Sequence, residues 1–214
     1  MNTVTVSASK TYDILIGSGI LSELGSRVRV LGKARKVCIV SETSVFPLWG
    51  ETARSSLEAA GFDVCAYVFP AGEESKNGEN LLKLLNFLAE NGLTRSDILV
   101  ALGGGVTGDL AGFAAACFLR GIRFVQVPTT LLAAVDSSVG GKTAVDLPAG
   151  KNLAGAFWQP SLVICDTDTL DTLPADIFRD GCAEVIKYGI LYDPKLFAHL
   201  EEKGLDFDRE AVIT

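Results

Sequence analysis

A run of glycines between two apolar segments constrains the fold of this chain more than any other feature. The apolar residues Ile98–Leu102 lead into the stretch GGGVTGD at Gly103–Asp109, and a second apolar run, Leu110–Ala116, follows. Glycine lets the backbone turn sharply and come close to a ligand, and the free amides of a helix N-terminus favour an anion such as a phosphate. The pattern therefore predicts a buried strand, a tight turn and a helix, with nucleotide binding as the first hypothesis.

Only part of the dinucleotide-binding fingerprint is present. The spacing Gly103-x-Gly105-x-x-Gly108 fits its glycines, but the fingerprint also expects an acid about 20 residues later, to hold the ribose. The next apolar run, Phe124–Val127, ends instead in Pro128–Thr130. An ordinary Rossmann assignment therefore fails in its second half, and a tight turn without a ligand stays open as the alternative.

Strand and helix signals alternate along most of the chain, which predicts an α/β fold. Further strands are expected at Thr3–Ser7, Tyr12–Ile16, Val37–Val40, Val64–Phe69 and Leu162–Asp166, and further helices at Ile20–Leu31, Leu48–Ala60 and Asn77–Asn91. The apolar strands indicate a Rossmann-like, mostly parallel sheet with helices on both faces over residues 1–173. Helical patterns at Ala175–Leu191 and Pro194–Lys203 predict that residues 174–214 begin a second, α-helical domain.

Composition and charge favour a small-molecule function. The 214 residues are 48% hydrophobic with a net charge of −7 and no run of basic residues, which argues against nucleic acid or an anionic membrane as a partner. The N-terminus has neither the pattern of a signal peptide nor that of a membrane span, so a cytoplasmic protein is expected. Five widely spaced cysteines support neither a disulfide framework nor a thiolate metal site.

Polar clusters follow the predicted strands, where ligands of open parallel sheets collect. Glu42 follows one strand, and Glu73 and Lys76 follow the next, so acids and a lysine are available for ribose hydroxyls and phosphates. Solvated loop charges are the alternative interpretation. Gly141-Lys142-Thr143 is similar to the end of a Walker A motif, but Asp136 stands where that motif requires glycine, so a P-loop is rejected.

A set of cations accompanies these turns in a chain that is acidic overall, which suggests an anionic substrate. Its members are Arg120, Arg123, Lys142, Lys151 and Lys187, and Asp136, Asp146 and Asn152 are associated with them.

Three segments carry a family resemblance. They are GGGVTGD, the segment PTTLLAAVDSSVGGKTAVDLPAGKN that begins at Pro128, and RDGCAEVIKYG, which begins at Arg179. These segments occur in the order and at the separations of the 3-dehydroquinate synthase family, and the chain resembles that family along essentially its whole length. Other sugar-phosphate cyclases are close relatives of that family, and glycerol and iron-dependent alcohol dehydrogenases are more distant ones.

The resemblance implies an NAD- and metal-dependent lyase of the shikimate pathway, which converts 3-deoxy-arabino-heptulosonate 7-phosphate into 3-dehydroquinate and phosphate. Transient oxidation of a hydroxyl acidifies the neighbouring C–H bond so that phosphate can leave, and the hydride is then returned. With Glu42, the expected cofactor-binding residues are Glu73, Lys76, Gly104, Gly105, Val106, Gly108, Asp109, Thr129, Thr130, Lys142, Lys151, Thr169 and Thr172. The expected catalytic and substrate-binding residues are Arg120, Asp136, Lys142, Asn152 and Lys187.

The metal site is expected to be incomplete. By resemblance Glu184 is a ligand of a divalent metal, zinc or cobalt, although without the family it would be interpreted as an ordinary helix carboxylate beside Lys187. Two further histidine ligands belong to a later helical domain, and His199, the single histidine in the chain, matches neither. The chain is therefore expected to be the NAD-binding part of a longer, homodimeric synthase and to be inactive alone.

Two other functions stay open at this point. One is a different sugar-phosphate cyclase, such as 2-deoxy-scyllo-inosose synthase, that applies the same redox and elimination chemistry to another sugar phosphate. The other is a module that holds NAD without turnover.

Overall fold

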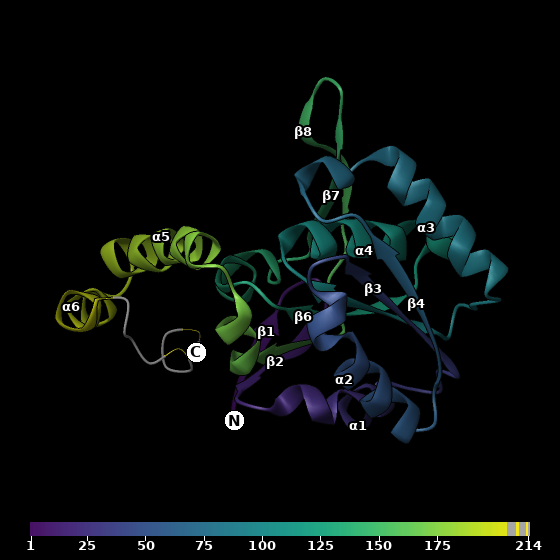
Figure 1. Ribbon diagram of the computed structural model, residues 1–214, viewed down its shortest axis with the longest axis horizontal. Helices are drawn as coiled ribbons and strands as arrows, with labels where there is room; N and C mark the ends of the chain where they lie inside the picture. The colour runs from purple at the N-terminus through teal and green to yellow at the C-terminus, as the bar shows by residue number, and fades with distance from the viewer. Residues whose placement is uncertain (205–208, 210–212, 214) are drawn as a thin grey trace.

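A twisted sheet of seven strands forms the centre of the molecule in a computed structural model that describes residues 1–204, 209 and 213 (Figure 1). Its strands lie in the order β1-β2-β9-β6-β5-β3-β4, and only β1 runs antiparallel to its neighbour. Their bounds are β1 Asn2–Ser7, β2 Thr11–Gly17, β3 Lys36–Glu42, β4 Asp63–Phe69, β5 Ile98–Gly103, β6 Arg123–Pro128 and β9 Leu162–Asp166. The predicted α/β fold with a mostly parallel, Rossmann-like sheet is confirmed.

Helices cover both faces of this sheet. One face carries η1 (Ile20–Glu23), α1 (Leu24–Arg29) and α2 (Phe46–Ala59), and the other carries α3 (Gly78–Glu90) and α4 (Gly105–Cys117). Short helical turns occupy connections: η2 Glu73–Ser75, η3 Phe118–Arg120, the π-helical η4 Ala133–Ser137 and η5 Thr167–Thr172. The predicted helix at Ile20–Leu31 is thus a 3₁₀ turn followed by a short α-helix.

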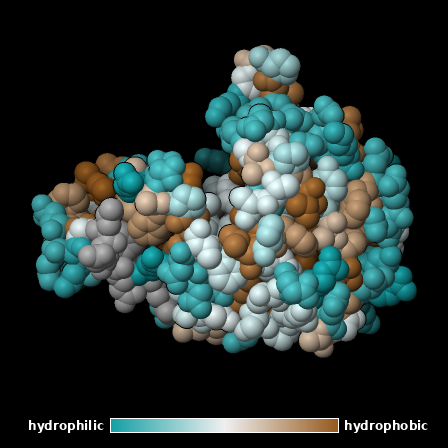
Figure 2. Space-filling view, viewed as in Figure 1, coloured by the Kyte–Doolittle hydropathy of each residue, from teal (hydrophilic) through white to brown (hydrophobic). Residues whose placement is uncertain are grey.

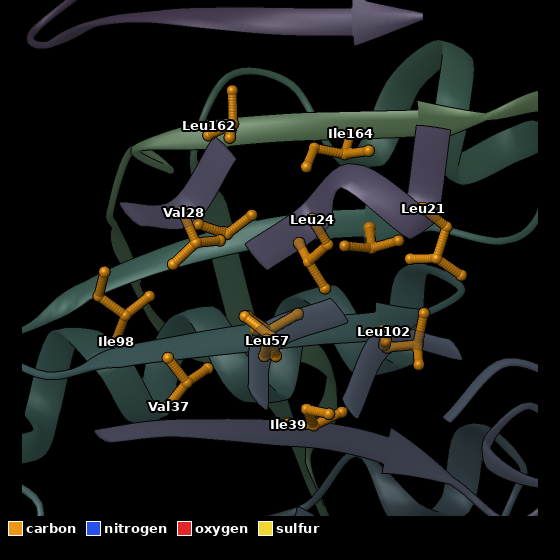
Figure 3. Packing of buried hydrophobic residues seen from close by; sticks show 14 of the residues in the cluster. Leu21, Leu24, Val28, Val37, Ile39, Leu57, Ile98, Leu102, Leu162 and Ile164 are labelled. Atoms are coloured by element: carbon orange, nitrogen blue, oxygen red, sulfur yellow. The ribbon is translucent and has the colours of Figure 1, made fainter. Parts of the chain in front are cut away.

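The core has two layers because successive strand residues point to opposite faces of the sheet. On β3, Val37 and Ile39 pack with α1 and α2, whereas Cys38 and Val40 pack with α3 and α4. Figure 3 shows the first of these layers, in which Leu24 and Leu57 pack against the strand residues. Strands buried on both faces are nearly continuous apolar runs, which is why the sequence pattern identifies them.

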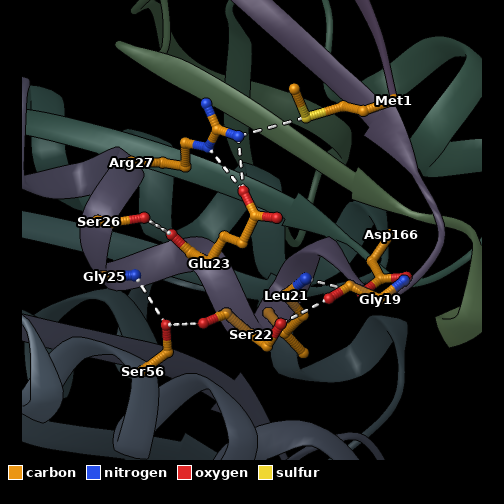
Figure 4. A network of polar contacts seen from close by, with 10 residues as sticks. All are labelled: Met1, Gly19, Leu21, Ser22, Glu23, Gly25, Ser26, Arg27, Ser56 and Asp166. Atoms are coloured by element: carbon orange, nitrogen blue, oxygen red, sulfur yellow. Dashed lines mark hydrogen bonds and ion pairs between the residues drawn. The ribbon is translucent and has the colours of Figure 1, made fainter.

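One buried carboxylate fastens the start of η1 to the end of β9. Asp166 accepts hydrogen bonds from the amides of Gly19 at 2.9 Å, Leu21 at 2.7 Å and Asp168 at 3.0 Å. Figure 4 shows the first two of these contacts beside the Ser22, Ser26 and Ser56 bonds that hold η1 and α1. The carboxylate thereby orients both η1 and η5.

A two-stranded hairpin, absent from the sequence-based expectation, projects from the molecule (Figure 1, top). It pairs β7 (Lys142–Leu147) with β8 (Gly150–Phe157) in antiparallel fashion. Most residues of β8 are exposed, so it lacks the apolar run that marks the other strands. The sequence indicates only a glycine–lysine turn in this segment, and the structure corrects that interpretation.

Two helices extend away from the sheet, α5 (Ala175–Leu191) and α6 (Pro194–Lys203), both with the bounds predicted (Figure 1, left). Gly181 of α5 packs closely on Leu131, and Gly189 packs on Phe197 of α6. Exposed apolar side chains at Ile186, Ile190 and Leu191 belong to the same end of the molecule, and Figure 2 shows hydrophobic surface there. The division at residues 173 and 174 stays a prediction.

No helix within the described part of the chain combines the length and the apolar character needed to cross a bilayer.

Candidate functional site

The chain changes direction within the sheet between β3 and β5. It runs from β3 outward to β4, then returns to the other side of β3 and continues through β5, β6 and β9. In open α/β sheets, such a switch point leaves a crevice outside the carboxyl ends of the two central strands, where ligands bind. Here Glu42 ends β3 and Gly103 ends β5, so both predicted clusters meet at this crevice.

A cavity of about 500 Å³ occupies the crevice. Eight of the residues predicted from the sequence line it: Glu42, Glu73, Gly104, Gly105, Val106, Thr129, Thr130 and Thr172. The structure adds Ser44, which precedes α2, Trp49 of α2 and Thr107 of α4. The volume is suitable for a small-molecule ligand. We call this space the cofactor cavity.

The glycine turn presents an open helix end to this cavity. Gly104 is the N-cap of α4, and no side chain in the described part of the chain caps the helix. Residues Gly104–Thr107 line the cavity, so the unpaired amides of the first turn and the positive end of the helix dipole are available to a phosphate. A Cβ on Gly103 would lie 2.4 Å from Oγ1 of Thr107, and glycine is therefore needed for the turn to close.

Two buried threonine hydroxyls at this cavity are without a hydrogen-bond partner among the described residues. Thr107 is fully buried and Thr129 is 2% exposed, and Oγ1 of each lacks a partner. A buried, unpaired hydroxyl is unfavourable, by about 1–3 kcal/mol. Since both residues line the cavity, the donor set fits a polar ligand that would satisfy them.

Gly108 has a different place. It is buried against β6, where an added Cβ would lie 2.6 Å from Oε1 of Gln126. It therefore supports the packing of α4 on the sheet and does not line the cavity.

A second cavity of about 630 Å³ lies between α4, η4 and the hairpin. Four of the expected residues line it, namely Asp109, Asp136, Lys142 and Asn152. One of these, Asp109, is only two residues beyond Thr107 on α4, so residues near the start of one helix line both spaces. We call this second space the substrate cavity.

Lys76 lies at the boundary between the cavities. Its Nζ lies 2.8 Å from Oδ1 of Asn152, 3.1 Å from Oδ2 of Asp109 and 3.3 Å from Oε1 of Glu73. Burial opposes the charge of Lys76, but Asp109 and Glu73 outweigh it and raise its pKa. Burial raises the pKa of Asp109, and Lys76 limits that rise. The two groups therefore depend on each other for their charges.

Helix α5 contacts the substrate cavity through Asp136, one of the residues that line it. The hydroxyl of Tyr188 donates to Oδ1 of Asp136 at 3.3 Å, and burial, followed by the charges of Asp136 and Glu184, raises the pKa of Tyr188 to about 12. Lys187 pairs with Glu184; this hydrogen bond, with a smaller contribution from Asp136, raises the pKa of Lys187. Four side chains from η4 and α5 thus form one connected group.

Three further expected site residues, besides Gly108, lie outside both cavities. Arg120 is exposed beyond the C-terminal end of α4, about 20 Å along the 13-residue helix from its open N-terminus. Thr169 is fully buried, and its hydroxyl donates to the backbone oxygen of Asp166 at 2.7 Å. Lys151 is exposed, and its Nζ lies 3.3 Å from Oε1 of Glu73.

The sequence patterns do not single out Trp49 or Tyr188. No local signal distinguishes Trp49, which the fold brings to the cofactor cavity from α2. Tyr188 lies inside the RDGCAEVIKYG segment, and that segment is the one signal that could have found it.

The described residues do not fit a metal ion. Over residues 1–204, with 209 and 213, no group of three or more His, Cys, Asp or Glu side chains is placed to hold one. Glu184, the expected ligand, is paired with Lys187. Because a catalytic zinc site usually has three protein ligands, Glu184 alone does not make such a site.

Comparison with known proteins gives a consistent result. Residues 66–180 match the family described as 3-dehydroquinate synthase N-terminal. The 3-dehydroquinate synthase of Geobacter metallireducens is 52% identical over 202 residues, which cover 94% of this chain and 56% of that protein. The chain spans about half the length of the curated relatives that it matches.

Solved structures of sugar-phosphate cyclases are similar as well. A 2-deoxy-scyllo-inosose synthase complexed with carbaglucose-6-phosphate, NAD⁺ and Co²⁺ is 31% identical with a TM-score of 0.81, over 87% of this chain and 50% of that one. A 2-epi-5-epi-valiolone synthase from Streptomyces hygroscopicus, with NAD⁺ and Zn²⁺ bound, is 30% identical with a TM-score of 0.83, over 94% of this chain and 55% of that one.

Proposed function

The chain belongs to the 3-dehydroquinate synthase family, and on that premise we propose that it supplies the NAD-binding part of a 3-dehydroquinate synthase. The proposed reaction is the conversion of 3-deoxy-arabino-heptulosonate 7-phosphate into 3-dehydroquinate and phosphate. The proposal includes a division of the chain into an α/β unit at residues 1–173 and the start of a helical unit at 174–214. A cytoplasmic homodimer is the proposed form of the complete enzyme.

The observation that carries the cofactor assignment is the open end of α4 beside two unpaired hydroxyls. An uncapped helix N-terminus and the buried Oγ1 atoms of Thr107 and Thr129 line one cavity at the switch point of the sheet. A pyrophosphate would accept hydrogen bonds from the helix amides, and the hydroxyls would pair with polar atoms of the ligand. Glu42, at the end of β3, would accept hydrogen bonds from ribose hydroxyls.

When bound, NAD supplies a reversible hydride transfer, which allows a substrate hydroxyl to exist temporarily as a ketone. The residues of this chain contribute binding and orientation. In the substrate cavity Lys142 and Asn152 present an ammonium and an amide toward an anionic sugar, while Asp136 is held in place by Tyr188. Lys187, beside Asp136, adds a second cation at the edge.

A second candidate is another sugar-phosphate cyclase, favoured by the similarity to 2-deoxy-scyllo-inosose synthase. Both candidates predict the same cofactor cavity, so the sugar phosphate distinguishes them. With NAD present, calorimetric binding of 3-deoxy-arabino-heptulosonate 7-phosphate but not of glucose 6-phosphate supports the synthase. The opposite preference supports the second candidate, and binding of neither leaves a module that only holds NAD.

The cofactor assignment is tested by calorimetric titration with NAD, with ATP as the control for a general nucleotide site. Thr129→Val should weaken NAD binding about fivefold to tenfold, since it removes one hydrogen bond worth about 1 kcal/mol. Ser138→Ala is a matched control, because Ser138 is also buried and unpaired but lines neither cavity. Equal NAD affinity in wild type and Thr129→Val would contradict the assignment of that hydroxyl.

A further inference from the structure

One buried ammonium contacts residues of both cavities. Glu73 lines the cofactor cavity, whereas Asp109 and Asn152 line the substrate cavity. Nζ of Lys76 lies within 3.3 Å of an oxygen atom of each of them. The two spaces are therefore connected by a single side chain that belongs to neither cavity lining.

This ammonium has little access to water. The side chain of Lys76 is 5% exposed, and a third carboxylate, that of Asp146, lies 3.9 Å away. An ammonium has three protons to donate, and the oxygens of Glu73, Asp109 and Asn152 are its nearest acceptors. Because electrostatic interactions are stronger where water is excluded, a change at one acceptor alters how strongly the ammonium is held by the other two.

Asn152 depends on this arrangement for its orientation. Its backbone adopts φ of +58°, a left-handed conformation that is uncommon for residues other than glycine. The backbone amide of Asn152 donates to Oδ1 of Asp146 at 2.7 Å, and the backbone amide of Asp146 donates to the backbone oxygen of Lys76 at 2.7 Å. A closed ring of contacts thus joins Lys76, Asp146 and Asn152 near the turn of the hairpin.

We propose that Lys76 is a positioning residue that couples the two cavities, so that NAD in the cofactor cavity fixes Asn152 in the substrate cavity. The proposal rests on the proposed function, because it takes NAD as the ligand. A ligand that engages the Glu73 carboxylate draws it from Lys76, and the ammonium then binds Asp109 and Asn152 more strongly. Occupation of the first cavity therefore prepares the second, which is a positive coupling between the two binding events.

The experiment is amide hydrogen exchange at residues 150–157, followed by mass spectrometry with and without saturating NAD, while calorimetry records NAD binding separately. In the wild type NAD should slow exchange at these residues at least about fivefold, the lower end of typical coupling between sites. In Lys76→Gln, exchange at residues 150–157 should be the same with and without NAD, at the NAD concentration that calorimetry shows to saturate this variant. The substitution removes the charge that connects the cavities.

A second variant guards against misfolding of Lys76→Gln. Asn152→Gly removes the side-chain amide whose oxygen accepts from Lys76, and glycine tolerates the left-handed backbone at this position. In this variant NAD should bind without slowing amide exchange in the hairpin. Lys83→Gln is the matched control. Lys83 also pairs with a glutamate, Glu79 at 2.7 Å, but its side chain is 59% exposed and lines neither cavity, so this variant should keep the wild-type response.

The outcomes separate the two proposals. Saturating NAD that leaves wild-type hairpin exchange unchanged overturns the coupling and leaves the cofactor assignment standing. A response that persists in Lys76→Gln or Asn152→Gly overturns the role of Lys76. Failure of the wild type to bind NAD at all overturns the proposed function of this chain, and the coupling falls with it.

Discussion

The indole of Trp49 donates a hydrogen bond from Nε1 to Oγ1 of Thr172, at 3.1 Å. Both residues line the cofactor cavity, Trp49 from α2 and Thr172 from the end of η5. The Thr172 hydroxyl in turn donates to the backbone oxygen of Thr169 at 3.0 Å. Its proton is therefore already used, and Thr172 shapes the wall of the cavity between α2 and the segment that leads into α5.

Removing the indole donor should loosen that wall. Trp49→Phe keeps an aromatic ring but loses the bond to Thr172, and NAD affinity should fall about fivefold, in line with about 1 kcal/mol for one hydrogen bond. Trp158→Phe is the control. The indole Nε1 of Trp158 donates to the backbone oxygen of Ile122 at 2.9 Å, and Trp158 does not line the cofactor cavity. Calorimetry measures both; an unchanged affinity in Trp49→Phe would show that the wall holds without this bond.

Asp166 should matter for stability more than for binding. Asp166→Ala leaves the three amides that it accepts from without a partner, at Gly19, Leu21 and Asp168. Since a hydrogen bond to a charged group contributes about 1.5–3 kcal/mol, the free energy of unfolding in urea should fall by at least about 3 kcal/mol. Asp168→Ala keeps its own backbone amide and should stay within about 0.5 kcal/mol of wild type.

Local signals predict the parts of the molecule that local physics determines. Ile98–Leu102 is an apolar run because a strand covered on both faces has no polar side, and the glycine turn follows from what a sharp strand-to-helix turn needs. The hairpin is not predictable in this way because β8 is mostly exposed, and its pairing with β7 gives no periodic apolar pattern.

Many residues that line the two cavities can be predicted from the sequence, but their arrangement cannot. Glu42, Thr129 and Asp136 can be identified because they follow strands or lie in a family segment. The contact of Lys76 with Asp109 and Asn152 joins three separate segments, and only the folded chain brings them together. Arg120 is grouped with the other cations by its charge alone, but it follows the C-terminal end of α4, opposite the open N-terminal turn.

A buried carboxylate away from the site gives a test of stability against pH. Burial favours a raised pKa for Asp97, but hydrogen bonds from the amides of Lys36, Thr94 and Arg35 and from the Thr94 hydroxyl hold the pKa below its ordinary value. The folded state therefore binds the proton more weakly than the unfolded state. The resulting stability is present above the ordinary pKa of about 4 and is lost as pH falls through that value toward the lower folded one.

Asp97→Asn should remove this dependence. At pH 7 the variant should be less stable than wild type by about 2 kcal/mol, and the difference should shrink as the pH falls below about 4. Denaturant unfolding at several pH values measures it. Asp63→Asn is the control, because Asp63 lies 3.5 Å from Lys36 with its side chain 62% exposed, and its effect should be small at every pH. A constant difference for Asp97→Asn would contradict the linkage.

The hairpin that carries Lys142 and Asn152 should depend on one close approach between its strands. Gly155 pairs with Ala144 in the register of β7 and β8, and a Cβ at Gly155 would lie 2.1 Å from the backbone oxygen of Thr143. Backbone atoms cannot rotate away as a side chain can, so Gly155→Ala forces the strands apart. Amide exchange in residues 142–157 should accelerate about tenfold or more, corresponding to at least about 1.4 kcal/mol of local stability.

Gly78→Ala is the matched control for that substitution. A Cβ at Gly78 meets no atom of the described residues within 4 Å, and alanine favours the helix by up to about 1 kcal/mol. Exchange in the hairpin should therefore stay at its wild-type rate. If Gly155→Ala likewise left hairpin exchange unchanged, strand pairing would not be what holds Lys142 and Asn152 at the substrate cavity. The placement of Asn152 would then depend on its contacts with Lys76 and Asp146.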